Sequence, residues 1–109
     1  MSNVGMSEEM MVAVAERFRV LSDVMRLKIL QQLQEGEKTV NELVALTGGS
    51  QPNVSKHLST LRTNDLVKRR QEGNLAYFSL ASPMVFQLCD IVCGGMREEL
   101  ESKKAMLKI

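Results

Sequence analysis

The residues best suited to chemistry form a short polar run near the middle of the chain. Residues 51–62 hold amides, hydroxyls and two cations but no acid, on the side of a helical pattern opposite Val54, Leu58 and Leu61. These polar residues are Gln51, Asn53, Ser55, Lys56, Ser59 and Arg62. Amides and hydroxyls bond to base edges in the major groove of DNA, and Lys and Arg contact phosphates. The pattern predicts a DNA-reading helix, and a plain solvated helix is the alternative.

A second candidate is the pair Cys89 and Cys93. Their i, i+4 spacing places both sulfur atoms on one face of a helix. Two thiolates at that distance can bind a soft ion, such as Zn(II), Cu(I) or trivalent arsenic, or react with oxidants and persulfides. Free cysteine is also a common small buried residue. Inert packing, metal or metalloid binding, and redox or sulfur sensing therefore all stay open.

Turn and capping residues position the polar helix. Gly48 and Gly49 end the preceding segment, because glycine takes positive φ without steric cost. Ser50 is a favourable N-cap for the amide of Asn53, and Pro52 fits the first turn of a helix.

The segment before the glycines also begins with a helix signal. Thr39 and Glu42 have the spacing of a capping box. Two short helices joined by a glycine turn predict a helix-turn-helix.

The period changes after Leu61. Residues 66–80 form two extended runs about Gly73-Asn74, a tight-turn pair, which predicts a β-hairpin. One arm carries Lys68, Arg69 and Arg70. A basic hairpin directly after a helix-turn-helix is a wing, which would lie along the DNA backbone or minor groove.

Helices are predicted at both ends of the chain. The first covers residues 7–20, and the second is expected to be capped by Ser22 with Asp23 in its first turn. The last begins at Ser82-Pro83 and runs towards Leu107, loosened at Gly94-Gly95. The terminal helix has more apolar surface than a small domain can cover, so we expect a homodimer built through the first and last helices.

Composition sets outer bounds on these interpretations. The chain of 109 residues is expected to form one domain, 1–109, with residues 1–6 lacking fixed structure. It has no apolar run of the roughly 20 residues that span a bilayer, and residues 1–11 hold no basic residue for a secretory signal. A cytoplasmic location without membrane partners is the expectation.

The positive charge is concentrated around the polar helix. The net charge is only +1, but residues 43–70 carry +4, against −2 for residues 1–42 and −1 for residues 71–109. This is the distribution that a phosphate-binding surface requires. An enzyme is not expected, because there is no phosphate-binding loop and His57 is the only histidine available as a base.

The order α-α-α-α-β-β-α, mainly helical with a small β-hairpin, resembles the ArsR/SmtB family of bacterial winged-helix repressors. The resemblance covers about residues 12–105 and rests on residues 21–30, 39–43, 50–61 and 65–67 with Gly73 and Tyr77. It implies a homodimer that binds a palindromic operator and is released by an inducer. It also implies that Gln51, Asn53, Ser55 and Lys56 lead the DNA contacts, with Arg70 and Asn74 on the wing.

The sensing motifs known in the family are missing here. Metalloid-sensing members carry a C-x-C-type motif in the third helix, where this chain has residues 42–47 without cysteine. Zinc-sensing members place Asp and His ligands along the last helix, which here has no histidine. A soft metal or metalloid ion at Cys89 and Cys93 remains as one possible cofactor. The alternative function is a winged-helix module for protein contact without a DNA target.

Overall fold

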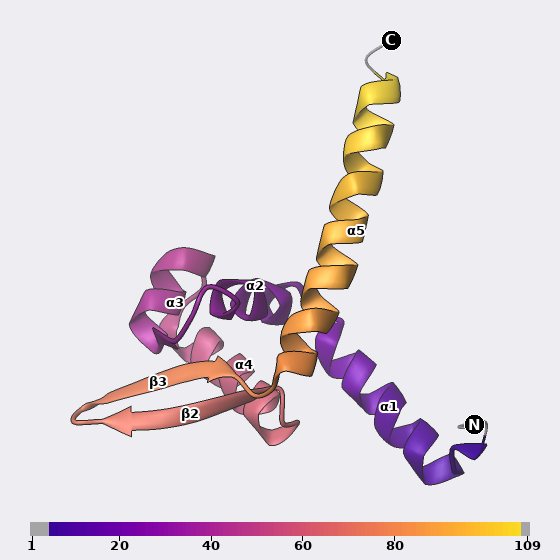
Figure 1. Cartoon of the computed structure of the whole chain (residues 1–109). Coiled ribbons are helices and arrows are strands. Elements are labelled where there is room, and N and C mark those ends of the chain that lie inside the picture. The colour runs from indigo at the N-terminus through magenta and orange to yellow at the C-terminus, as the bar shows by residue number, and fades with distance from the viewer. Residues whose placement is uncertain (1–4, 108–109) are drawn as a thin grey trace.

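A computed structural model describes residues 5–107 of the chain (Figure 1). The elements in order are α1 (Glu8–Leu21), α2 (Val24–Leu33), β1 (Lys38–Thr39), α3 (Val40–Thr47), α4 (Gln51–Thr63), β2 (Val67–Glu72), β3 (Leu75–Leu80) and α5 (Pro83–Leu107). The expectation of disorder in residues 1–6 falls mostly on residues 1–4, which lie outside the described range. This is the winged helix-turn-helix predicted from the sequence.

Most helix starts lie where the capping residues predict them. The Thr39 hydroxyl accepts from the Glu42 amide, and the Glu42 carboxylate accepts from the Thr39 amide at 2.8 Å, which completes the capping box. At the last helix the Ser82 hydroxyl accepts from the amide of Val85. These local bonds fix the start of α3 and α5 independently of tertiary packing.

The predicted cap of α2 was wrong by one residue. Asp23, not Ser22, is the N-cap, because its backbone is extended and its carboxylate accepts from the Arg26 amide at 3.0 Å. Ser22 instead ends α1, where its hydroxyl donates to the carbonyl of Arg19 at 2.8 Å. Ser and Asp are about equally favourable N-caps, so the sequence alone does not choose between them, and here Ser22 is engaged at the end of α1.

The sheet has one strand more than the predicted hairpin. Strands β2 and β3 pair antiparallel around a two-residue turn, with Gly73 at φ +59°. The two-residue β1 pairs with the other edge of β3, opposite Tyr77 and Phe78. So short a strand has no alternating pattern that could have revealed it.

The hydrophobic core lies among α2, α3, α4 and the base of the sheet. Its buried members are Val20, Ile29, Leu30, Leu33, Leu43, Val54, Leu58, Leu61, Leu66, Val67, Phe78, Val85 and Cys89. Val24 has the helical spacing of the buried residues of α2, so its side chain would be expected in the core, but it is 71% exposed.

Helices α1 and α5 extend away from this core. In Figure 1, α5 rises well clear of the winged-helix body and α1 runs outward from the base of α5. The radius of gyration is 16.5 Å, whereas a compact chain of this length has about 13 Å. Helix α5 is continuous through Gly94 and Gly95, so the predicted loosening does not occur.

The two projecting helices expose many large apolar side chains. These are Met10, Met11, Val12 and Phe18 on α1, and Met84, Phe86, Ile91, Val92, Met96 and Leu100 on α5. So much exposed apolar surface is typical of an interface with a partner. Within the described residues no helix is both long and apolar enough to cross a bilayer.

Candidate nucleic-acid interface

Helix α4 buries one face and presents the other to solvent. Val54, Leu58 and Leu61 are at most 1% exposed, and the helix packs against α2, α3 and β2. The predicted DNA contacts lie on the opposite side: Gln51, Asn53, Lys56, Ser59 and Arg62 are exposed and Ser55 is half-buried. The structure therefore places all six predicted residues of α4 where at least part of each side chain is accessible.

The turn before α4 is fixed by two glycines. Gly48 adopts the left-handed conformation at φ +79°, which ends α3. A Cβ on Gly49 would lie 3.0 Å from Met25 Cε and 3.1 Å from Val54 Cγ2, so the turn packs closely against α2. The Ser50 hydroxyl then accepts from the Asn53 amide at 3.3 Å. With no acid in its first turn, α4 keeps the positive end of its dipole uncompensated by side chains.

The β2–β3 wing extends this basic surface, but the Arg70 side chain is paired with acidic residues of the chain itself. Lys68, Arg69 and Asn74 are exposed, as the sequence predicted. The Arg70 guanidinium is already engaged, since it donates to both oxygens of Glu37 at 3.0 and 3.1 Å and forms an ion pair with Glu72. It also lies 4.7 Å from the centre of the Tyr77 ring.

These contacts change how Arg70 can meet DNA. Glu37 and Glu72 raise the pKa of Arg70, and the Arg70 hydrogen bond holds the pKa of Glu37 below its ordinary value. A phosphate would have to replace these carboxylates. The partner Glu37 lies 33 residues away in the chain, and no local pattern could have revealed it.

His57 connects α4 to a residue that the sequence did not single out. Its Nδ1 accepts a hydrogen bond of 3.1 Å from Nε of Arg26 on α2. The side chain of His57 is only 13% exposed. His57 is thus a packing residue on the inner side of α4.

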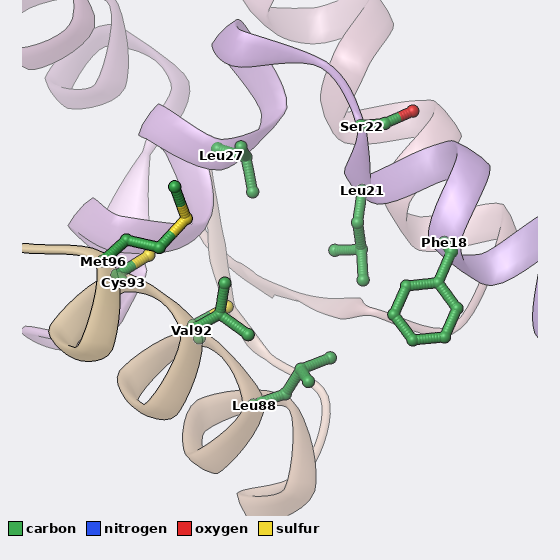
Figure 2. A pocket seen from close by; sticks show the side chains of 9 residues that line it. Phe18, Leu21, Ser22, Leu27, Leu88, Val92, Cys93 and Met96 are labelled. Atoms are coloured by element: carbon green, nitrogen blue, oxygen red, sulfur yellow. The ribbon is translucent and has the colours of Figure 1, made fainter. Parts of the chain in front are cut away.

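The two cysteines lie beside an apolar cavity of about 400 Å³ between α1, α2 and α5 (Figure 2). It is lined by Phe18, Leu21, Ser22, Leu27, Leu88, Cys89, Val92, Cys93 and Met96. Cys89 is buried and Cys93 is exposed. Burial, and secondarily the neighbouring Cys93, raises the pKa of the Cys89 thiol. Among the described residues, no three His, Cys, Asp or Glu side chains gather as a metal site.

Comparison with known proteins finds relatives that are all named as transcription regulators or repressors. The family model described as "Bacterial regulatory protein, arsR family" matches residues 23–69. The chain is 37% identical over 81 residues to the regulator KmtR of Mycobacterium tuberculosis (74% of this chain, 62% of that protein). It is 43% identical over 74 residues to a probable mercury resistance operon repressor of Streptomyces lividans (68% and 59%). It is 32% identical over 92 residues to the arsenical resistance operon repressor of Escherichia coli (84% and 79%). The match spans less than two thirds of the first two relatives.

Solved structures extend the similarity over the whole fold. The crystal structure of Rv0081 from M. tuberculosis superposes with a TM-score of 0.79 at 30% identity, covering 89% of this chain and 98% of that one. The homodimeric winged helix-turn-helix domain of Mb0332 from Mycobacterium bovis superposes with a TM-score of 0.80 at 30% identity, covering 92% and 95%.

Proposed function

The chain belongs to the ArsR family of DNA-binding transcription regulators, and from this premise we propose that it is a homodimeric repressor that binds an operator through α4 and the β2–β3 wing. The single observation that carries the proposal is the acid-free, accessible face of α4 next to a basic wing. A symmetric dimer would place two copies of α4 in successive major grooves of a palindrome, about 34–36 Å apart.

Each exposed residue has a role that follows from its chemistry. We assign Gln51 and Asn53 to base edges, because a side-chain amide can pair with adenine through two hydrogen bonds. Ser55 and Ser59 would add hydroxyl contacts, while Lys56, Arg62 and Lys68 would neutralise phosphates. Asn74 at the wing tip would meet the backbone or minor groove, together with Arg70 once its carboxylate partners are displaced.

The homodimer accounts for the apolar faces of α1 and α5. Phe18, Leu21 and Leu88 line both the cavity beside the cysteines and a second groove between α1 and α5, so the apolar surface is continuous. A second copy of the chain would cover it. The relative Mb0332 is homodimeric in solution, which supports this arrangement.

The test of operator binding is a titration into labelled DNA from the region upstream of its own gene, at several salt concentrations. Log affinity decreases linearly with log salt, and the magnitude of this negative slope falls by about 0.9 for each lost phosphate contact. Lys56→Gln removes one contact from each protomer, so the slope should fall by roughly 1.8 in the dimer. Lys28→Gln is the matched control, since it removes an exposed cation from α2.

Two outcomes would count against the proposal. An unchanged slope for Lys56→Gln and likewise for Arg62→Gln would exclude α4 as a phosphate-binding element. No binding of the wild type to any DNA, even at low salt, would favour the alternative of a winged helix used for protein contact.

For induction, we propose that Cys89 and Cys93 are the sensing groups and that a soft ion is the inducer. Both thiols border one cavity with the thioether of Met96, and thiolate and thioether sulfur are the ligands that soft ions prefer. One chain supplies two thiols, and a dimer four. The relatives named for mercury and arsenical resistance support a soft ion. An oxidant or persulfide acting on the same thiols is the competing inducer class, and packing alone is the third possibility.

The sensing proposal is tested with the same DNA titration. Adding mercuric ion, arsenite or zinc should release the wild type and leave a Cys89→Ser/Cys93→Ser variant bound. Release of the wild type by a persulfide donor alone would favour the competing inducer class. Because the Cys89 thiol holds its proton more firmly than usual, ion binding must displace that proton. The effective ion concentration should therefore fall as the pH rises. Release of both proteins, or of neither, would reduce the cysteines to packing residues.

A further inference from the structure

We propose that Arg26 is a positioning residue that fixes the recognition helix α4 relative to α1, and thereby sets the placement of the two recognition helices on the operator. The inference rests on the proposed function, because it concerns how a dimer aligns two copies of α4. It adds a residue of α2 that itself makes no DNA contact.

One side chain joins three helices here. From α2, the Arg26 guanidinium donates through Nε to His57 Nδ1 on α4 at 3.1 Å and through Nη1 to the carbonyl of Val20 on α1 at 2.9 Å. Both bonds are partly buried. The Arg26 amide in turn donates to Asp23, whose Oδ1 lies 4.0 Å from His57 Nε2.

The contact on α1 meets a need of that helix. The last four carbonyls of a helix have no partner within it, and cations are favourable at this end. The amide and the hydroxyl of Ser22 both donate to the carbonyl of Arg19. Arg26 donates to the next carbonyl, that of Val20, whose side chain is fully buried.

The contact on α4 depends on the chemistry of both partners. His57 can accept at Nδ1 only when that nitrogen has no proton, so the bond selects the neutral form with hydrogen on Nε2. The planar guanidinium can donate to His57 and to Val20 at once, whereas the ammonium of a lysine is a single point charge on a flexible stem. Arg26→Lys is therefore a stringent change that keeps the charge.

This link matters because α1 extends away from the winged-helix body (Figure 1). If α1 packs against a second copy, the link from α1 through Arg26 to α4 relates the dimer axis to the recognition helix. A change of tilt in one protomer is repeated in its partner. A tilt of α4 therefore changes the spacing of the two recognition helices in the dimer more than it changes the fit of one helix in its own groove.

The first readout is the nitrogen spectrum of the imidazole, which is unambiguous because His57 is the only histidine. At neutral pH the wild type should show a single tautomer, with an unprotonated, hydrogen-bonded Nδ1. Arg26→Gln and Arg26→Lys should show a mixture of tautomers, while Lys28→Gln should match the wild type. A spectrum unchanged by Arg26→Gln would overturn the proposed link.

The second readout compares a palindromic operator with a single half-site. We expect Arg26→Gln to weaken binding to the palindrome at least tenfold, to change half-site binding about twofold or less, and to keep the salt slope. Equal losses on both DNAs would show a general effect on folding. A salt slope lower by about 1.8 would make Arg26 a phosphate contact. Either result would overturn the positioning role.

The two proposals can fail separately. Failure of the wild type to bind any DNA would refute the repressor and, with it, the DNA role of Arg26. The imidazole spectrum would still report the Arg26–His57 bond on its own. Wild-type operator binding with an unchanged Arg26→Gln variant would refute only the positioning role.

Discussion

The apolar side chain of Phe18 offers a quantitative test of the dimer. Phe18 lies on α1 and borders the cavity beside the cysteines (Figure 2). It also borders the second groove and is 60% exposed in the protomer. Full burial of such a side chain stabilises by about 1.5–3 kcal/mol. The share still exposed is therefore worth roughly 1–2 kcal/mol if a partner covers it. Because a two-fold dimer holds two copies, Phe18→Ala should cost roughly 2–4 kcal/mol per dimer.

That cost translates into a dimer dissociation constant about 30 to 700 times higher, at 1.4 kcal/mol for each factor of ten. Sedimentation equilibrium over a range of protein concentrations would measure it. Leu75→Ala is the matched control, because Leu75 is 49% exposed but lies at the tip of the wing. A Phe18→Ala dimer as tight as the wild type, with a folded protomer, would refute the assignment of this face.

Two further predictions concern individual charged residues. The pKa of Asp23 is held below its ordinary value, chiefly by the hydrogen bond from the Arg26 amide, so its ionised form stabilises the fold. Asp23→Ala should lower the free energy of unfolding by about 1 kcal/mol at pH 7. In urea unfolding this difference should persist at pH 5 and shrink below about pH 4; a difference independent of pH would contradict the capping role. Glu37→Gln should remove one of the two carboxylates that hold the guanidinium of Arg70 and leave only its ion pair with Glu72. Loss of this acid beside the wing should raise operator affinity roughly twofold to fivefold, the range for a surface ion pair. The same DNA titration measures it, and weaker binding would show that Glu37 instead holds Arg70 in its productive position.

Local signals in the sequence predicted most of the helix-turn-helix. Thr39 with Glu42, the glycine turn, and Ser50 with Pro52 each act within four residues, so their effect can be inferred without tertiary context. The accessible face of α4 could also be predicted, because Val54, Leu58 and Leu61 recur at helical spacing and leave the polar residues on the opposite side. The thiol pair was visible as well, but only the structure separated a buried Cys89 from an exposed Cys93.

The features that escaped prediction are those made by distant pairs. β1 is too short for a pattern and exists because β3 offers a free edge. Arg70 pairs with Glu37 and Arg26 with His57 across 33 and 31 residues. Val24 has a suitable spacing on α2 but points to solvent, because the period of a helix does not say how wide its buried stripe is. Long-range packing decides each of these cases.

The central claim is that two copies of α4 lie in successive major grooves, and chemical footprinting tests it most directly. Dimethyl sulfate methylates guanine N7, which faces the major groove. On an operator selected from random DNA, the wild type should protect guanines in two clusters centred about one helical turn apart. Asn53→Ala should weaken both clusters equally, whereas Lys28→Gln should preserve them. Protection at one cluster only, or none in the major groove despite tight binding, would contradict the account.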